Sequence, residues 1–237
     1  METKLSFRQG IKDAIPICIG YFSVALAFGV LAVKNNWPLW APPFISATNL
    51  SGTGQFAAID LLNASSSFAE IALATLIINA RYFLMSVSLS QKIPAEIKGW
   101  QRFIIAFGNT DENYAVAMAK QQPLTFIYML GVILCSFSGW FGGTLAGTFM
   151  GNIVPEVLSS AFGISLYAMF LAIIVPPSTE SKPVLFTVLF SAAMSILIYY
   201  LPHLSFISSG WSIIICGIAS SVVAALLFPV KEDSVEQ

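Results

Sequence analysis

The chain has 237 residues, of which 57% are hydrophobic and only 10% are charged, and its formal net charge is −1. Soluble domains carry roughly 25% charged residues, so a soluble fold of this length could not cover so much apolar surface. A nucleic-acid partner is excluded as well, because phosphate binding needs a basic stripe that this sequence lacks. We therefore expect a protein whose solvent is the lipid bilayer.

Apolar runs in chain order predict an all-α, polytopic membrane protein, because a spanning helix needs about 20 mostly apolar residues. The first run is too long for the core of a secretory signal and is followed by further runs, so we interpret it as an uncleaved helix. No linker or composition change separates a second domain, and residues 1–237 are interpreted as a single transmembrane transporter domain. The six predicted full spans are Ala14 to Val33, Phe68 to Ser90, Leu124 to Met150, Val157 to Val175, Val184 to Leu201 and Phe206 to Phe228.

Two further segments are apolar at their ends but polar at their centres. Ala41 to Leu62 reads APPFISATNLSGTGQFAAIDLL, and Arg102 to Ala119 reads RFIIAFGNTDENYAVAMA. Non-helical backbone survives at membrane depth only where protein or a water-filled cavity surrounds it. Transporters use such discontinuous helices to bind a solute near the bilayer midplane. We therefore predict two broken or re-entrant segments; the alternative is a pair of loops outside the membrane.

The distribution of basic residues favours re-entry over a full crossing. The basic residues before Ala14 place the N-terminus in the cytoplasm, where Lys and Arg concentrate. A full crossing by Ala41 to Leu62 would put the basic residues between Ser90 and Phe103 outside, whereas re-entry puts them inside. Re-entry of Arg102 to Ala119 likewise puts Lys120 inside and both termini in the cytoplasm.

Arg81 is the charged residue placed most deeply in a predicted span, within the run IINARYFLMS beside Asn79 and Tyr82. An ionisable group at the bilayer centre costs on the order of 3 kcal/mol or more, so Arg81 calls for a partner. That partner is either a substrate carboxylate or an acidic side chain such as Asp111 or Glu112.

Asp111 and Glu112 are neighbours, and on a helix they point about 100° apart. One could therefore face the ammonium group of a solute while the other faces a cation. A carboxylate removed from water holds a proton more readily, which makes proton coupling feasible. The alternative is a solvated acidic pair in a surface loop.

Gln55 follows the sequence SGTG in the first broken segment. Gly52 and Gly54 would let backbone N–H groups approach a carboxylate, as at a helix N-terminus, with Asn49 and Gln55 adding amide groups. Short Gly/Ser stretches are common, and the spacing alone does not distinguish a site from an ordinary turn. Glu70, near a segment end, is interpreted as being in contact with water or headgroups.

Gly139, Gly143, Gly147 and Gly151 recur every four residues and form a smooth stripe on one helix face. Such stripes let helix backbones approach closely, within the chain or against a partner.

These polar elements together resemble one family, the AzlC-type (azaleucine resistance) branched-chain amino-acid permeases. The resemblance is carried by SATNLSGTGQFAAIDLL, by Asn79-Ala80-Arg81 and by FGNTDENYAVA, and it extends over nearly the whole chain. It implies an exporter of leucine, isoleucine, valine and their analogues, with methionine a further candidate. It also implies a small AzlD-type membrane subunit as partner and a bacterial plasma (inner) membrane location.

The resemblance directs attention to specific residues. The predicted substrate-binding residues are Asn49, Gly52, Gly54, Gln55, Asn79, Arg81 and Tyr82, and the predicted coupling or ammonium-binding residues are Asp111 and Glu112. The family usually has small or apolar residues where Asn49-Leu50 stands, and often another aromatic or a histidine at Tyr82.

No cofactor, metal site or enzymatic activity is expected. Cys18, Cys135 and Cys216 lie far apart in apolar runs, with no CxxC or Cys/His grouping. The chain has no HExxH, GxSxG or Walker motif. The competing interpretation is a channel-like or scaffold membrane subunit without coupled transport, in which the polar clusters only hold helices together.

Overall fold

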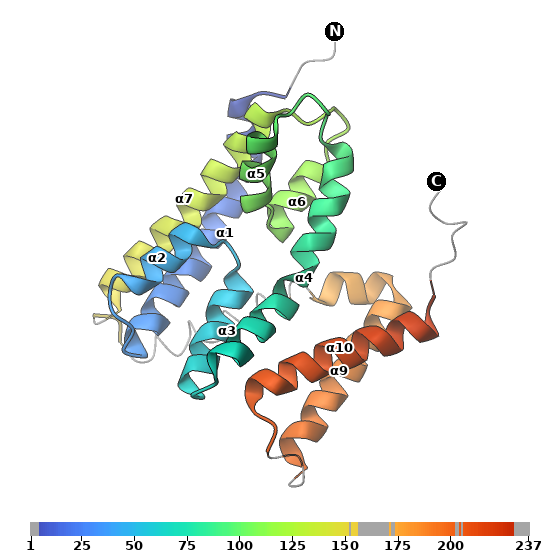
Figure 1. The fold of residues 1–237 in the computed structure, drawn as a ribbon. Helices are drawn as coiled ribbons and strands as arrows, with labels where there is room; N and C mark the ends of the chain where they lie inside the picture. Colours follow the sequence, from blue (N-terminus) through green and yellow to red (C-terminus); the bar gives the residue numbers. More distant parts are fainter. Residues whose placement is uncertain are drawn as a thin grey trace. The chain divides into compact units, whose positions relative to one another are not determined.

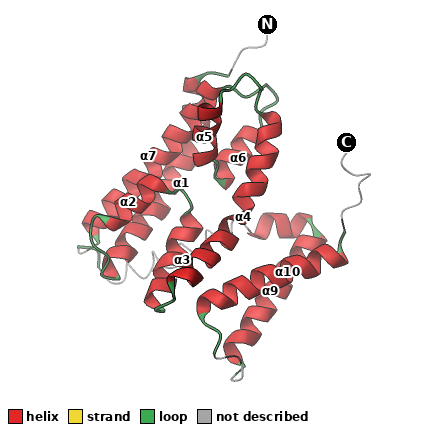
Figure 2. Cartoon of the chain, viewed as in Figure 1, coloured by secondary structure: helices red, strands yellow, loops and turns green. Residues whose placement is uncertain are grey.

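The computed structural model describes residues 5–151, 153–155, 171, 174–201, 204 and 206–229. The regular elements in these ranges are helices, and the described residues form no strand (Figure 2). The chain forms two compact units. The first comprises Met1–Phe56 and Ile78–Ser165, and the second Ala57–Ile77 and Leu166–Gln237.

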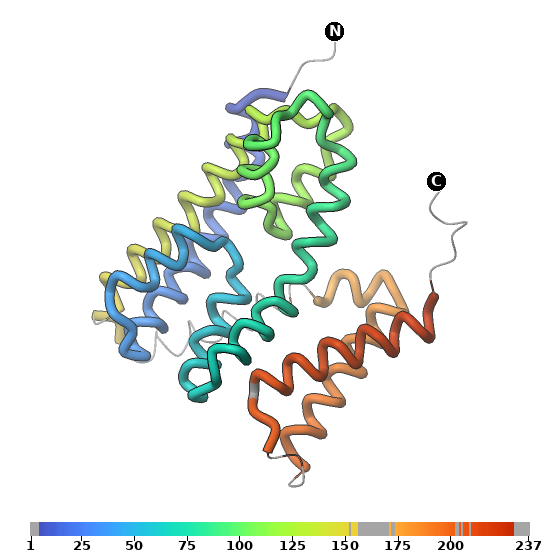
Figure 3. The backbone as a smooth tube through the Cα atoms, in the orientation of Figure 1, coloured from blue at the N-terminus to red at the C-terminus, as the bar shows by residue number. Residues whose placement is uncertain are grey.

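The first unit is built around α1 (Phe7–Lys34) and α7 (Phe126–Met150). A Cβ atom added to Gly139, Gly143 or Gly147 would come within 2.3, 2.3 or 2.1 Å of a backbone carbonyl oxygen of α1. These carbonyls belong to Cys18, Phe22 and Leu26 in turn, so successive contacts move toward the C-terminus of both helices. The helices therefore run parallel, side by side, as the tube in Figure 3 shows. The predicted glycine stripe is confirmed as a close helix contact within the chain.

The first polar segment forms a broken pair, α2 (Ala41–Thr48) and α3 (Gly52–Asn63). The ring of Phe28, in the last third of α1, contacts both Trp37, before α2, at 6.3 Å and Phe56, in α3, at 5.6 Å. Between these two contacts, Gly52 lies against the ring of Trp140 near the middle of α7. The chain thus starts at the end where α1 finishes, extends along α1 and α7 to about their middle, where the helix is interrupted, and then turns back.

The second polar segment forms the pair α5 (Gly99–Phe107) and α6 (Asp111–Met118), which turns back in the opposite sense. Trp100 contacts Phe126 at the start of α7, with ring centroids 5.3 Å apart, and Phe107 contacts Phe137 further along α7 at 6.3 Å. After the break, Lys120 forms an ion pair of 2.7 Å with Asp13 near the start of α1. The pair therefore enters and leaves at the end where α1 and α7 begin.

The part of α4 (Phe68–Lys92) from Ile78 onward belongs to the first unit and runs antiparallel to α1 and α7. Leu89, in the last turn of α4, and Ile93, just after its end, pack in one core cluster with Leu5, ahead of α1, and Leu124, ahead of α7. The end of α4 therefore lies where the other two helices start (Figure 1).

Five helices of the described part are long and apolar enough to cross a membrane: α1, α4, α7, α9 (Lys182–Tyr200) and α10 (Ser209–Leu227). They confirm five of the six predicted spans, although α1 begins at Phe7 rather than Ala14 because Ser6 caps it. The predicted span Val157 to Val175 falls almost entirely outside the described residues. Large apolar side chains such as Phe83, Leu84 and Leu226 are exposed, as a lipid-facing surface requires.

In the second unit, α9 packs on α10 through Phe186 and Phe228, whose ring centroids are 5.5 Å apart. Glu70 is only 6% exposed, so the prediction that it contacts water or headgroups is wrong. Its carboxylate accepts hydrogen bonds from the Ser208 hydroxyl and, at 3.2 Å, from the Trp211 N–H. The N-terminus of α10 covers Glu70, where the helix dipole stabilises a negative charge.

The glycine contact can be tested by a matched pair of substitutions on α7. Gly143→Ala should destabilise the protein by about 1–3 kcal/mol, because the new Cβ atom would meet the α1 backbone. Gly142→Ala meets nothing within 4 Å and should be neutral or stabilising, by up to about 1 kcal/mol, through higher helix propensity. Thermal unfolding of the detergent-purified variants would measure both. Equal effects would contradict the parallel α1–α7 contact.

Candidate functional site

The two breaks open onto one cavity of about 180 Å³. One liquid water occupies about 30 Å³, so the space suits a small solute. No lining side chain carries a charge. The lining residues are Asn49, Leu50 and Ser51 from the α2–α3 break, Asn79 and Tyr82 from α4, and Ala106, Phe107, Asn109 and Thr110 from the α5–α6 break.

Side chains replace the missing helical hydrogen bonds at the α2–α3 break. The Ser51 N–H donates to Asn49 Oδ1 at 2.6 Å, and the Ser51 hydroxyl donates to Asn79 Oδ1 at 2.5 Å. Gln55 Nε2 donates to the Asn49 carbonyl at 2.6 Å. The Gln55 side chain is 2% exposed, and its Oε1 accepts a hydrogen bond from the Ser46 hydroxyl at 3.2 Å. Gln55 therefore stabilises the break and does not line the cavity.

The α5–α6 break is held in a similar way. Thr110 caps α6 by accepting from the Asn113 N–H at 3.4 Å, and Asn113 Nδ2 donates to the Gly108 carbonyl at 2.8 Å and to Ser136 Oγ at 2.9 Å. Gly108 is required here, because a Cβ atom would lie 2.4 Å from the side chain of Ile133. Asn109 Nδ2 donates to Ser86 Oγ of α4 at 2.9 Å, which ties the break to that helix.

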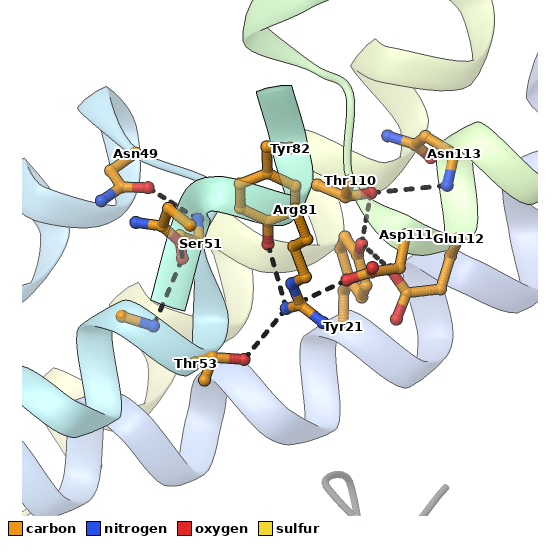
Figure 4. A network of polar contacts seen from close by, with 12 residues as sticks. Tyr21, Asn49, Ser51, Thr53, Arg81, Tyr82, Thr110, Asp111, Glu112 and Asn113 are labelled. Atoms are coloured by element: carbon orange, nitrogen blue, oxygen red, sulfur yellow. Dashed lines mark hydrogen bonds and ion pairs between the residues drawn. The ribbon is translucent and has the colours of Figure 1, made fainter. Parts of the chain in front are cut away.

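Arg81 forms an ion pair with Asp111, with 3.1 Å between Nη2 and Oδ2. The same Nη2 donates to Thr53 Oγ1 at 3.2 Å, so the guanidinium links α4 to both broken pairs (Figure 4). Of the two partners considered for Arg81, the structure shows the acidic side chain. The two side chains are 30% and 29% exposed, and neither is among the residues that line the cavity.

The neighbouring acids diverge as their helical spacing predicts. Asp111 faces Arg81, whereas Glu112 faces α1, where the Tyr21 hydroxyl donates to its Oε2 at 2.5 Å. The same Tyr21 oxygen lies 2.6 Å from Thr110 Oγ1. Figure 4 shows both carboxylates beside the break, pointing toward different helices.

Several buried polar atoms near the two breaks have no hydrogen-bond partner among the described residues. They include Asn109 Oδ1, Asn113 Oδ1, Arg81 Nε and Trp140 Nε1. Buried polar atoms in native proteins nearly always have a partner, from protein or bound molecules. Their presence around the breaks marks this region as a candidate ligand site.

The structure brings the predicted site residues to one region but not to one surface. Asn49, Asn79 and Tyr82 line the cavity, whereas the other six lie beside it: Gly52, Gly54, Gln55, Arg81, Asp111 and Glu112. Asn109 and Thr110 belong to the polar run seen in the sequence. Tyr21, in an ordinary apolar helix, gave no signal in the sequence.

A double-mutant cycle would test the Arg81–Asp111 pair. Asp111→Asn and Arg81→Gln each leave one half-buried charge without its partner, so the double variant should lose less stability than the two single losses added together. We expect a coupling of about 1 kcal/mol, a modest value because both side chains are partly exposed. Thermal unfolding at low salt would measure it, and strictly additive losses would show that the pair does not interact.

Comparison with known proteins places these features within one family. Residues 16–154, which include both breaks and α4, match the model of the AzlC protein family. The chain is 28% identical over 228 residues to the inner membrane protein YgaZ of Escherichia coli K12, covering 93% of this chain and 91% of the relative. No solved structure matches the chain.

Two further relatives cover most of the chain. An uncharacterized membrane protein of Archaeoglobus fulgidus is 33% identical over 172 residues, 72% of this chain and 75% of its own length. The branched-chain amino acid transport protein AzlC of Bacillus subtilis is 22% identical over 180 residues, 75% of this chain and 70% of its own length.

Proposed function

The chain belongs to the AzlC protein family, and on this premise we propose that it is a permease that exports branched-chain amino acids from the cell. The similarity to an E. coli inner membrane protein supports a bacterial plasma-membrane location. The observation that carries the proposal is the uncharged cavity between the two broken helix pairs.

The lining of the cavity suits a small amino acid with an aliphatic side chain. Amide and hydroxyl groups of Asn49, Asn79 and Thr110 supply donors and acceptors for a zwitterion, while Leu50 and Phe107 supply an apolar wall. Ligand sites commonly combine a few polar groups with a mostly apolar wall in this way.

The two broken pairs act as re-entrant hairpins that enter the bilayer from opposite faces, with both termini in the cytoplasm. Basic side chains support this orientation because they gather at the end where α1 and α7 begin. There, Lys92 Nζ donates to the Met118 carbonyl at 2.7 Å, and Lys120 pairs with Asp13. A cytoplasmic location for this end satisfies the positive-inside rule.

The working complex contains a small AzlD-type membrane subunit, and the chain is its large subunit. Arg81, Asp111 and Glu112 serve the transport cycle by holding the hairpins on α4 and α1. The competing function is a scaffold subunit without coupled transport, which is favoured by the many polar groups, such as Gln55, that bond only within the protein.

Efflux measurements distinguish these functions. Cells that express the chain with the small subunit and are preloaded with labelled leucine or valine should show saturable efflux. Asn79→Ala should lower this efflux about tenfold at equal membrane abundance, because it removes a cavity amide and frees the Ser51 hydroxyl. Ser90→Ala, an exposed site whose hydroxyl bonds its own helix, is the matched control. Non-saturable efflux, or none, would favour the scaffold, and net uptake would reverse the direction.

Cysteine labelling tests the re-entrant topology. In a variant without the native cysteines, Ala64→Cys between α3 and α4 should react with an impermeant maleimide added outside the cell. Ala95→Cys, after α4, should react only after permeabilisation. Both alanines are exposed, so accessibility within the protein does not limit either reaction. Full crossings by the broken pairs predict the reverse pattern.

A further inference from the structure

The walls of the cavity differ in electrostatic character, although no charged side chain lines it. The α5–α6 side carries Asp111 and Glu112 in the first turn of α6, whereas the first turn of α3 has no acidic residue. Of these two acids, only Asp111 has a cationic partner among the described residues. Arg81 pairs with Asp111, whereas the Tyr21 hydroxyl donates to Glu112. The α5–α6 side therefore keeps an excess negative charge.

The α5–α6 side also contains a buried polar atom without a hydrogen-bond partner in the described part. Asn109 is 4% exposed and lines the cavity, and its Nδ2 is bonded to Ser86 while its Oδ1 has no partner in the described part. An amide oxygen beside excess negative charge is a good acceptor for an ammonium group.

The α3 side has the opposite character. The first N–H groups of a helix lack partners within the helix and carry the positive end of its dipole. At α6 the carboxylates of Asp111 and Glu112 offset this dipole, whereas at α3 the first turn contains Gly52, Thr53 and Gly54 and no acid. Ser51, which precedes α3, lines the cavity, and its Oγ already accepts from the Gly54 N–H at 3.3 Å. An anion in the cavity can therefore approach the N–H groups of Gly52 and Thr53, which come before Gly54 at this helix end.

We propose that the transported amino acid lies across the cavity with a fixed polarity. Its carboxylate binds at the N-terminus of α3, beside Ser51, and its ammonium group binds Asn109 Oδ1 on the α5–α6 side, near Glu112. Arg81 is not a ligand of the substrate but a positioning residue that holds Asp111 and thereby α6. This inference rests on the proposed function, because it requires an amino-acid substrate.

Ligand fragments combined with variants test the polarity. Labelled leucine bound to the purified full-length chain would be displaced by leucine, by isopentylamine, which lacks the carboxylate, and by 4-methylpentanoate, which lacks the ammonium group. Asn109→Ala should lower the affinity for leucine and for isopentylamine about tenfold or more, and should leave the affinity for 4-methylpentanoate within about twofold of wild type. Ser51→Asp, which places a carboxylate at the N-terminus of α3, should show the reverse selectivity: weaker binding of leucine and 4-methylpentanoate, with isopentylamine binding within about twofold of wild type.

A charge variant keeps the test decisive if Asn109→Ala folds poorly. Asn109→Asp retains an acceptor at the same position and adds negative charge, so it should strengthen isopentylamine binding and weaken 4-methylpentanoate binding. Ser90→Ala should change neither. Equal losses for both fragments, or the opposite selectivity, would overturn the polarity while wild-type leucine binding still supported the proposed function. A wild-type chain that binds no leucine would overturn both.

Discussion

A helix that breaks at mid-height leaves backbone N–H and C=O groups without helical partners, and hydrocarbon cannot supply substitutes. Both breaks of this protein meet that constraint with side chains. Asn49 and Gln55 serve the first break, and Thr110 and Asn113 serve the second. The cavity exists because two such breaks come together beside α4.

The polar network also explains why charged residues are tolerated at this depth. Arg81 contacts Asp111 of α6 and Thr53 of α3, so a single guanidinium connects α4 to both hairpins. Glu112 adds a link to α1 through Tyr21. The charges thus fix the relative positions of helices around the cavity and leave its walls to neutral amides and hydroxyls, which can bind a solute without a large desolvation cost.

Sequence alone predicted the helical class, five of the described spans, and the positions of both breaks, because apolar runs and clustered Gly, Asn and Asp are local signals. It left open whether Arg81 pairs with a ligand or with Asp111, since that depends on which face of α4 meets α6. It misplaced Glu70, because α10, which covers this residue, lies about 140 positions further along the chain. Tyr21 has no local signal at all, since its role depends on the packing of α6 against α1.

The contact between α1 and α7 has a consequence for motion. Backbone meets backbone at successive turns, with no side chain between Gly139, Gly143 or Gly147 and the facing carbonyls. If either helix slid or rotated against the other, a bulkier residue would take the place of a glycine at the contact and would clash with the facing backbone. The two helices therefore move as one rigid body. In the transport cycle that we propose, alternating access to the cavity would come from tilting of the two broken pairs, α2–α3 and α5–α6, against these two helices.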